Sequence, residues 1–529
     1  MLFVRGAADT RLADAVDVRL ADAADVRQAD AVDTRLAQPR AKKTLSGGRR
    51  KYFPVGSGAV PYSASPRKAF SSLASAHLCE WFVPHAAGRL KRMFPVAPLL
   101  KRMVPVKPLL QRMLPAALLK RMLPVGALGL VAIGPAFATV APASSDSVVE
   151  RGRYLATAGN CISCHTREGG QPFSGGLAFN TPFGTIYSTN ITPNPETGIG
   201  SWSEQDFQHA VRDGVGPGGQ HLYPAFPYTA FTKLSDADVA ALFAYLKTLQ
   251  PVSYEAPANG LGFPYNQRWT LGIWKMLFFD DGRFVADKSR SAQWNRGAYL
   301  VESLGHCSSC HSPRNFLGAE RSDLAMTGGE YSDKVPGGDI RTWSAPNLTS
   351  AKNGLASWPV AELAAYLKTG RNAFVDTFGP MNEVIMNSTR HLGDDDVLAM
   401  ATYLKSLPAK QGATGSAPSA EVMQTGSSLY DVNCGTCHLP TGLGGDAENA
   451  GARLAGSPVV QASNPASLIN IILHGPTLAD PPLPKRWKAM EGFGDKLSDE
   501  EVAALASFVR NSWGNTGGAV STDQVAKQR

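Results

Sequence analysis

The sequence is short of spare cysteines, of long apolar runs and of basic residues beyond its first quarter. Only Cys79 of the seven cysteines lies outside a C-x-x-C-H pentapeptide, and disulfides would show no preference for a following histidine. From residue 144 on, no apolar run reaches the roughly 20 residues of a membrane-spanning helix. Residues 1–143 hold 22 of the 52 Lys and Arg but 8 of the 44 Asp and Glu. The remainder is therefore net negative, at 30 basic against 36 acidic residues, which gives no support for nucleic-acid binding.

The sequence does have one pentapeptide three times, at residues 161–165, 307–311 and 434–438. C-x-x-C-H attaches c-type haem, because two thiols at that spacing reach the two vinyl groups while the adjacent imidazole binds the iron. A zinc ribbon needs its two C-x-x-C halves within about 20 residues of each other, whereas these first cysteines lie 146 and 127 residues apart. The sequence predicts three covalent haem c groups on Cys161, Cys164, Cys307, Cys310, Cys434 and Cys437, with His165, His311 and His438 as proximal iron ligands.

Residues 1–119 are built from repeats rather than from a domain pattern. An eight-residue repeat covers 12–35, and a ten-residue repeat over 90–119 places a proline in each copy, which a helix cannot accommodate. We expect a low-complexity, disordered leader that arises from a start codon assigned too early, with Met103, Met113 or Met122 as the true initiator.

Residues 120–143 read as a signal peptide. Lys120 and Arg121 precede a mostly apolar stretch, and A-x-A cleavage sites follow at 136–138 and 141–143. A transmembrane anchor is the alternative, but the apolar stretch is short and contains Gly and Pro. Because haem is attached to c-type cytochromes after export, we expect the protein on the periplasmic side of the bacterial inner membrane.

The predicted fold is mostly α: three tandem class I cytochrome c domains with long loops behind a disordered N-terminal extension. The predicted domains cover 144–250, 291–410 and 426–515, with an aromatic-rich connector at 251–290, a linker at 411–425 and a C-terminal tail at 516–529. The helix before each pentapeptide has a glycine that permits close helix crossing and an aromatic soon after it; the glycines are Gly152, Gly297 and Gly426, and the aromatics are Tyr154, Tyr299 and Tyr430.

The last helix of each domain has a recognisable start. Residues 235–238 and 498–501 read as capping boxes, in which side-chain oxygens accept from the first N–H groups of the helix, and residues 392–396 take the same place in the middle domain. Asn-x-Thr loops at 190–192 and 347–349 repeat as well. Such loops either bond haem propionates or, by default, form turns.

The sixth iron ligand differs between the domains. His/Met ligation draws its thioether from the loop before the last helix, where the third domain offers Met490 and the second offers Met381, with Met386 as runner-up. The first domain has Phe226 in that loop and no methionine between Cys161 and Met276. The first haem is then five-coordinate or takes a ligand from elsewhere; the candidates are His221, His209 and Met276.

Several motifs resemble those of the three-haem cytochrome c subunits of bacterial membrane-bound dehydrogenases; they stand at 198–202, 296–300, 379–381 and 510–515. Family members with quinoprotein alcohol dehydrogenase partners usually have Met at the place of Phe226. The Phe form is similar to the branch of nicotinate or isoquinoline dehydrogenase cytochrome subunits, whose partners are molybdenum hydroxylases. Residues 294–299 and 304–307 are similar to that branch too.

This resemblance implies a non-catalytic subunit that relays electrons from a periplasmic dehydrogenase to membrane quinone or a terminal oxidase. A molybdenum hydroxylase is the favoured partner, and a quinoprotein or flavoprotein is the alternative. Competing functions are a peroxidase-like enzyme with an open first haem and a haem subunit of a terminal oxidase. The aromatic residues of 260–284 predict either peripheral membrane or partner contact, or packing between two domains.

Overall fold

The computed structural model describes residues 145–529 except 335–337, 339, 448–449, 477–486 and 488. The predicted leader, the signal peptide and Cys79 lie outside the described residues. Those that are described belong to one compact unit of the chain, and helices account for most of its regular structure.

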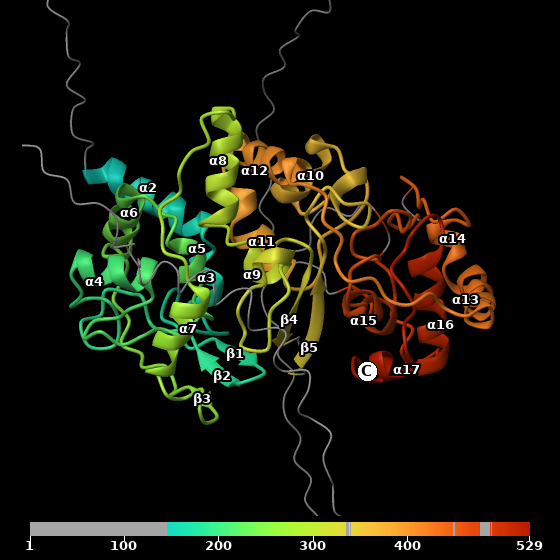
Figure 1. The fold of residues 1–529 in the computed structure, drawn as a ribbon, viewed down its shortest axis with the longest axis horizontal. Helices are drawn as coiled ribbons and strands as arrows, with labels where there is room; N and C mark the ends of the chain where they lie inside the picture. Colours follow the sequence, from blue (N-terminus) through green and yellow to red (C-terminus); the bar gives the residue numbers. More distant parts are fainter. Residues whose placement is uncertain (1–144, 335–337, 339, 448–449, 477–486, 488) are drawn as a thin grey trace, which may run out of the picture. The chain divides into compact units, whose positions relative to one another are not determined.

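Three pairs of crossing helices form the frame of the fold (Figure 1). The first helix pair is α2 (Ser145–Ala158) with α6 (Asp236–Leu246), the second is α8 (Ala292–Glu302) with α12 (Asp394–Ser406), and the third is α13 (Ala420–Asn433) with α16 (Asp499–Asn511). Within each pair a one-turn helix carries the pentapeptide: α3 (Cys161–Cys164), α9 (Ser308–His311) or α14 (Gly435–His438). The prediction of a mostly α fold is confirmed.

The other elements are short. The helices are α4 (Glu204–Gln208), α5 (Tyr228–Phe231), α7 (Thr270–Phe278), α10 (Val360–Thr369), α11 (Met381–Asn387), α15 (Ala466–His474) and α17 (Thr522–Ala526). Single turns are the π-helical η1 (His209–Asp213) and the 3-10 turns η2 (Ser322–Leu324), η3 (Leu355–Ser357) and η4 (Thr389–His391).

The predicted glycines are the crossing points of the helix pairs. A Cβ added at Gly152 would lie 1.9 Å from the carbonyl oxygen of Ala241, and one at Gly297 would lie 1.9 Å from that of Ala399. At Gly426 the corresponding distance, to Ala504, is 2.3 Å. Backbone meets backbone at each crossing, so only glycine fits there, and the packing reason expected from the sequence is confirmed.

Gly297→Ala is expected to destabilise the fold. The new methyl group would overlap a helix backbone that has no side-chain freedom to yield, and overpacking of this kind costs about 1–3 kcal/mol. Urea unfolding followed by circular dichroism measures the effect. Gly282→Ala is the matched control, because no atom lies within 4 Å of its added Cβ. Equal midpoints for the two variants would contradict the crossing geometry.

The two predicted capping boxes differ in the structure. Ser498 and Glu501 form the full box, with the Ser498 N–H donating to Glu501 Oε2 at 2.8 Å. Ser235 Oγ accepts from the Asp238 N–H at 3.2 Å, but the Asp238 carboxylate accepts from Arg151 at 2.7 Å instead of closing the box. The predicted bond from the Ser235 N–H to the Asp238 carboxylate is therefore wrong. The charged Arg151 guanidinium takes the place of that backbone N–H as the donor.

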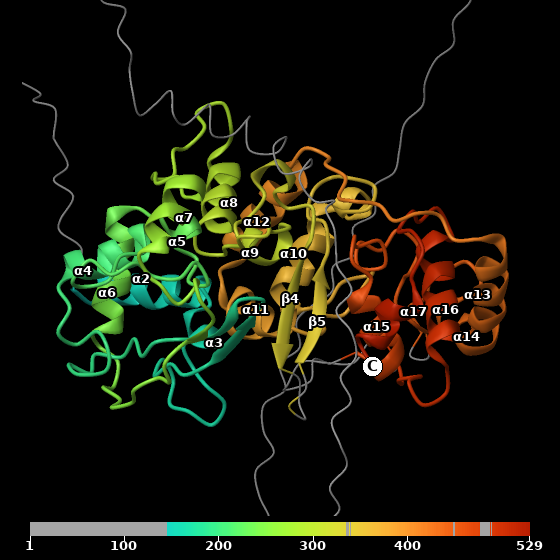
Figure 2. The same cartoon turned by 60° about the horizontal axis from the view of Figure 1, so that its bottom comes forward.

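Two β-hairpins follow the first and second pentapeptides, where the sequence predicted only loops. β1 (Ala178–Thr181) pairs antiparallel with β2 (Gly184–Tyr187), which also pairs with β3 (Gly260–Leu261). β4 (Gly329–Lys334) pairs antiparallel with β5 (Ile340–Ala345), as Figure 2 shows. Strands of two to six residues are too short for a reliable alternation of apolar and polar residues.

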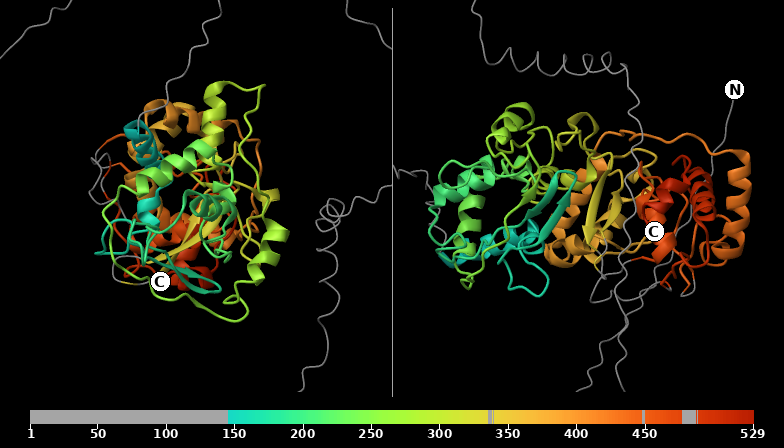
Figure 3. Two further views of the ribbon diagram at one scale, coloured as in Figure 1. Left: turned by 90° about the vertical axis from the view of Figure 1, so that its left-hand side faces the viewer. Right: turned by 90° about the horizontal axis from the view of Figure 1, so that it is seen from below.

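The first two helix pairs share one hydrophobic core, and the third pair has its own. The third pair is joined to the second through α15, which lies beside β5 (right-hand view of Figure 3). Ser344 N–H donates to Ser467 Oγ at 2.9 Å, and Asn470 Nδ2 donates to the Thr342 carbonyl at 2.8 Å. Polar contacts therefore connect the third helix pair to the second, whereas apolar packing fuses the first and second.

The structure places helices in two segments for which the sequence predicted a linker and a tail. α13 begins at Ala420, within the predicted linker 411–425, because Ser419 caps it and accepts from the Val422 N–H at 3.2 Å. The predicted tail 516–529 contains α17, and Val525 is fully buried in the third core. Both segments therefore belong to the third helix pair.

Candidate haem centres

The three pentapeptide histidines are arranged alike. Nδ1 of His165 lies 2.6 Å from the Thr189 carbonyl oxygen, Nδ1 of His311 lies 2.8 Å from that of Pro346, and Nδ1 of His438 lies 2.6 Å from that of Ala452. A carbonyl only accepts, so Nδ1 carries the proton and the Nε2 lone pair is left free. Burial lowers the pKa of each imidazole, which favours the neutral form that binds iron.

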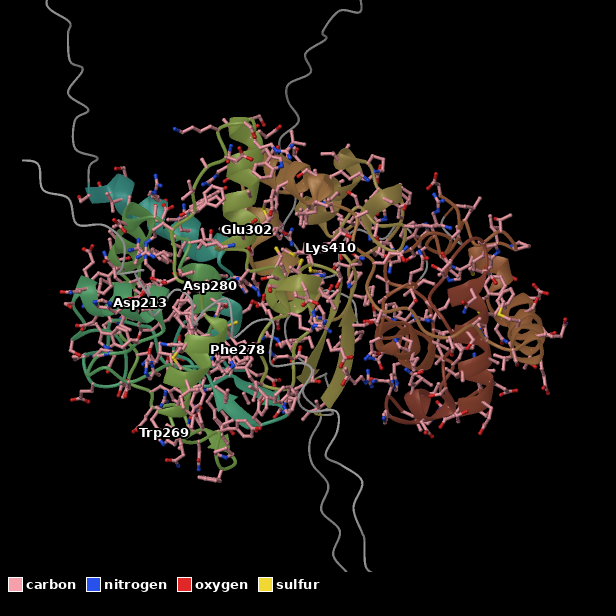
Figure 4. All side chains as sticks on the ribbon, viewed as in Figure 1. Asp213, Trp269, Phe278, Asp280, Glu302 and Lys410 are labelled. Carbon is pink, nitrogen blue, oxygen red and sulfur yellow. The ribbon has the colours of Figure 1, made fainter. Side chains whose placement is uncertain are left out.

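The Asn-x-Thr loops hold the first two of these carbonyl groups. Asn190, next to Thr189, donates through Nδ2 to the Val252 carbonyl at 2.7 Å. Asn347, next to Pro346, donates to the Lys410 carbonyl at 2.8 Å, and Lys410 is labelled in Figure 4. Their Oδ1 atoms accept from the backbone N–H groups of the threonines two residues on. The turn interpretation is confirmed, and the turns orient the histidines of the first two pentapeptides.

No disulfide joins any two of the six pentapeptide cysteines. Burial raises the pKa of Cys161 and of Cys307 to about 12 and that of Cys434 to about 11. Paired thiols beside an imidazole with a free Nε2 fit covalent haem c at all three places, and such a haem accepts and donates single electrons.

The first and second pentapeptides lie close together. Burial, followed by the Cys161 thiol, the Glu383 carboxylate and the Cys310 thiol, raises the pKa of Cys164 to about 12. Asn387 Nδ2, at the end of α11, donates to Ser163 Oγ between the two cysteines of the first pentapeptide at 2.8 Å. The side chain of Phe231 also packs edge-on against His306, with ring centroids 5.6 Å apart.

The candidate distal methionines lie at the cores that close these sites. Met381 is the first residue of α11 and packs against the core shared by the first two helix pairs. Met490 packs against the core of the third pair. The Sδ of the runner-up, Met386, accepts from Arg390 at 3.0 Å, which favours Met381 over Met386 as the ligand.

The first site has Phe226 where the others offer methionine. Phe226 packs against the shared core, with its ring centroid 5.5 Å from that of Phe231. His209 is an exposed residue whose Nδ1 lies 2.8 Å from Asp213, and Met276 is 53% exposed on α7.

The remaining candidate, His221, packs against α7. Its Nδ1 lies 3.1 Å from Lys275 Nζ, and its Nε2 is the atom nearest to a Cβ built at Gly272, at 3.2 Å. Burial, and then the Lys275 charge, lowers the pKa of His221. Both ring nitrogens face α7, which favours a structural role for His221 over iron ligation.

α7 anchors the connector to both neighbouring regions. Lys275 Nζ donates to the Asp213 and Gly214 carbonyls, each at 2.6 Å, and Trp274 Nε1 donates to the Leu317 carbonyl at 3.0 Å. Figure 4 labels Trp269 and Phe278 along this segment. The outer face is apolar and exposed; its residues are Phe263, Trp269, Ile273, Met276 and Leu277. The connector therefore serves packing on one side and leaves an apolar surface on the other.

One partly buried acidic residue that the sequence did not single out joins the first helix pair to the second. Glu302, at the end of α8 (Figure 4), accepts from Lys233 Nζ at 2.5 Å and from the hydroxyl of Tyr403. Nothing local marks Glu302, because its partners lie 69 and 101 residues away.

Two known family models match separate parts of the chain, one around the first helix pair and one around the third. Residues 149–250 match the family model of cytochrome c, and residues 421–509 match that of subunit III of cbb3-type cytochrome c oxidase. The chain is 43% identical over 400 residues to one subunit of the nicotinate dehydrogenase of Pseudomonas putida, a match that covers 73% of this chain and 32% of that protein. Thus it spans about a third of that relative.

Two further relatives are matched over most of their length. The gluconate 2-dehydrogenase cytochrome c subunit of Pantoea cypripedii is 40% identical over 408 residues, or 73% of this chain and 90% of the relative. A diheme cytochrome c-type protein of Cereibacter sphaeroides is 38% identical over 264 residues, or 49% of this chain and 86% of the relative. Among the described helices, none is both long and apolar enough to cross a membrane.

Proposed function

Because this chain belongs to the family of cytochrome c subunits of bacterial dehydrogenases, we propose that it binds three haem c groups and relays electrons from a periplasmic dehydrogenase to membrane quinone or a terminal oxidase. One arrangement, found three times, carries the proposal. Two thiols lie beside a histidine whose Nδ1 is hydrogen-bonded to a backbone carbonyl and whose Nε2 is free. His165, His311 and His438 hold the iron, and the cysteines hold the porphyrin edge.

The relay is tested on the complex purified through a tag on this chain. Candidate substrates of the partner (nicotinate, an aldehyde, gluconate or ethanol) are added, and haem reduction is followed optically. One substrate is expected to reduce the haems, and a soluble ubiquinone analogue is expected to reoxidise them. Haems that stay oxidised while the co-purified dehydrogenase turns over with an artificial acceptor would contradict the relay.

A molybdenum hydroxylase is the favoured partner, and a quinoprotein or flavoprotein is the alternative. The support is Phe226 at the place of a distal methionine, together with the similarity to the nicotinate dehydrogenase chain. Mass spectrometry of the co-purified catalytic chain decides between them. A bound molybdenum cofactor supports the favoured partner, and bound pyrroloquinoline quinone or flavin contradicts it.

Phe226→Met is expected to raise the reduction potential of the first haem, because a thioether ligand stabilises the reduced iron. The measurement is a redox titration of the full-length protein. Phe316→Met is the control, because Phe316 is 76% exposed and lies outside the predicted distal loop. If Phe226→Met moves neither spectrum nor potential, the Phe226 loop does not face the first iron.

Two other functions give different signatures. An enzyme with an open first haem predicts a prompt shift of about one haem in three when CO is added to reduced protein, whereas a relay whose haems are all six-coordinate predicts none. The match of residues 421–509 to an oxidase subunit model favours an oxidase subunit as the second candidate. That function predicts co-purification with a copper-containing membrane subunit.

Peripheral membrane association is part of the proposal, and the exposed apolar face of α7 supports it, since aromatic side chains favour the membrane interface. Trp269→Glu combined with Ile273→Glu is expected to release most of the protein from anionic lipid vesicles in a flotation assay. The control is Val285→Glu, which changes an apolar residue that is 84% exposed outside α7. Equal flotation of both variants with the parent would remove α7 as the contact.

A further inference from the structure

Two tyrosines link the first and second helix pairs in the same way but in opposite directions. Tyr154 on α2 donates its hydroxyl proton to Asp396 Oδ2 on α12 at 2.6 Å and accepts from the Gly393 N–H at 3.1 Å. Tyr299 on α8 donates to Asp238 Oδ2 on α6 and accepts from the Ser235 N–H at 3.2 Å. Each tyrosine thus caps and pins the last helix of the other pair.

Each aspartate is fixed from its own side by an arginine one residue before the crossing glycine. Arg151 Nε donates to Asp238 Oδ1 at 2.7 Å. Arg296 makes two bonds of 2.7 Å to Asp396. The aspartate side chains are 3% and 17% exposed, so these charge-assisted bonds are shielded from water.

The tyrosines are suited to donate at neutral pH. Burial, followed by the hydrogen bond to the carboxylate, raises the pKa of Tyr154 and of Tyr299 to about 12. Together these bonds form an interface between the first and second helix pairs. The same residue positions of each pair contact the same positions of the other, as in a two-fold dimer.

The third helix pair has none of the three residues, arginine, tyrosine and aspartate, at the corresponding positions. Around Gly426, Thr425 stands where the arginine would be and Ser428 where the tyrosine would be. Glu501, at the place of the two aspartates, closes its own capping box. The third pair also has a separate core. The sequence Arg-Gly-x-Tyr thus occurs only in the two pairs that join.

We propose that residues 145–410 form a two-haem module in which Tyr154 and Tyr299 are positioning residues that hold the first and second haems at a fixed separation for electron exchange, with the third haem unit joined as a separate body. The inference rests on the proposed function, because it assumes haem at the first two pentapeptides. It is supported by the hydrogen bond of 2.8 Å from Asn387 on α11 to Ser163 in the first pentapeptide and by the diheme relative, whose alignment of 264 residues is about the length of this module.

The test uses the full-length exported protein and the variants Tyr154→Phe, Tyr299→Phe and their combination. Phenylalanine keeps the ring and removes the hydroxyl. Tyr430→Phe is the matched control, because the Tyr430 hydroxyl donates to the Leu439 carbonyl within the third helix pair. The haem content of every variant is measured first, since fewer than three haems in the parent protein would refute the proposed function independently of the module.

With three haems bound, two measurements report on the module. Circular dichroism in the Soret region detects coupling between two nearby haems, and hydrogen exchange measures the Ser235 and Gly393 amides. The double variant is expected to lose most of the coupled Soret signal, and the two amides are expected to exchange about tenfold faster or more, since each loses an acceptor in a charge-assisted network. Each single variant is expected to give an intermediate Soret signal and to speed the exchange of its own amide alone, Gly393 for Tyr154→Phe and Ser235 for Tyr299→Phe. Tyr430→Phe is expected to show none of these changes.

An unchanged Soret signal with unchanged amide exchange in the double variant would overturn the proposal. Loss of the Soret signal in Tyr430→Phe as well would also overturn it, because the coupling would then not belong to the first two haems. If the double variant does not accumulate, the two single variants decide by the same two measurements.

Discussion

Cys434→Ser combined with Cys437→Ser is expected to reduce covalent haem from three to two per chain. Serine has no thiol to bond a vinyl group, and a haem held by the His438 bond alone dissociates on denaturation. The pyridine haemochrome assay on denatured protein measures the loss.

The matched control is Thr436→Ser, which changes a residue between the same two cysteines and is expected to leave three haems. Equivalent double substitutions at the first and second pentapeptides are expected to give the same loss of one haem each. A double variant that still carries three covalent haems would show that the third pentapeptide does not bind one.

Met490→Ala is expected to lower the potential of one haem by on the order of 0.1 V or more, because axial ligands set haem potentials over a range of roughly 0.8 V. All three haems are expected to stay attached, since the thioether bonds and His438 are untouched. A potentiometric titration of the full-length protein resolves the change.

Met423→Ala provides the comparison for Met490→Ala. Met423 lies on α13 in the same helix pair but outside the loop that precedes α16, so its removal is expected to leave all three potentials in place. A Met490→Ala protein with the potentials of the parent would remove Met490 from the list of ligands.

The sequence could predict what is encoded locally. A pentapeptide fixes the haem chemistry within five residues, and a glycine inside an apolar helical pattern indicates a helix crossing, as at Gly152 and Gly297. The full capping box at Ser498 is encoded within four residues. Patterns of this length do not depend on how distant segments meet.

The contacts between distant segments could not be predicted. The carbonyl that orients His311 belongs to Pro346, 35 residues on, and the aspartate that accepts from Tyr154 lies 242 residues on. Tyr430 follows a helix glycine as Tyr154 and Tyr299 do, but by four residues instead of two, and its hydroxyl bonds within its own helix pair. The difference in spacing is visible in the sequence, but only the folded chain shows which partner each hydroxyl bonds.

The central claim is that this chain carries three covalently bound haems, and intact-mass spectrometry of the exported full-length protein under denaturing conditions tests it most directly. The expected mass is that of the processed polypeptide plus three haem groups. A mass with two haems or fewer in fully matured protein would contradict the claim.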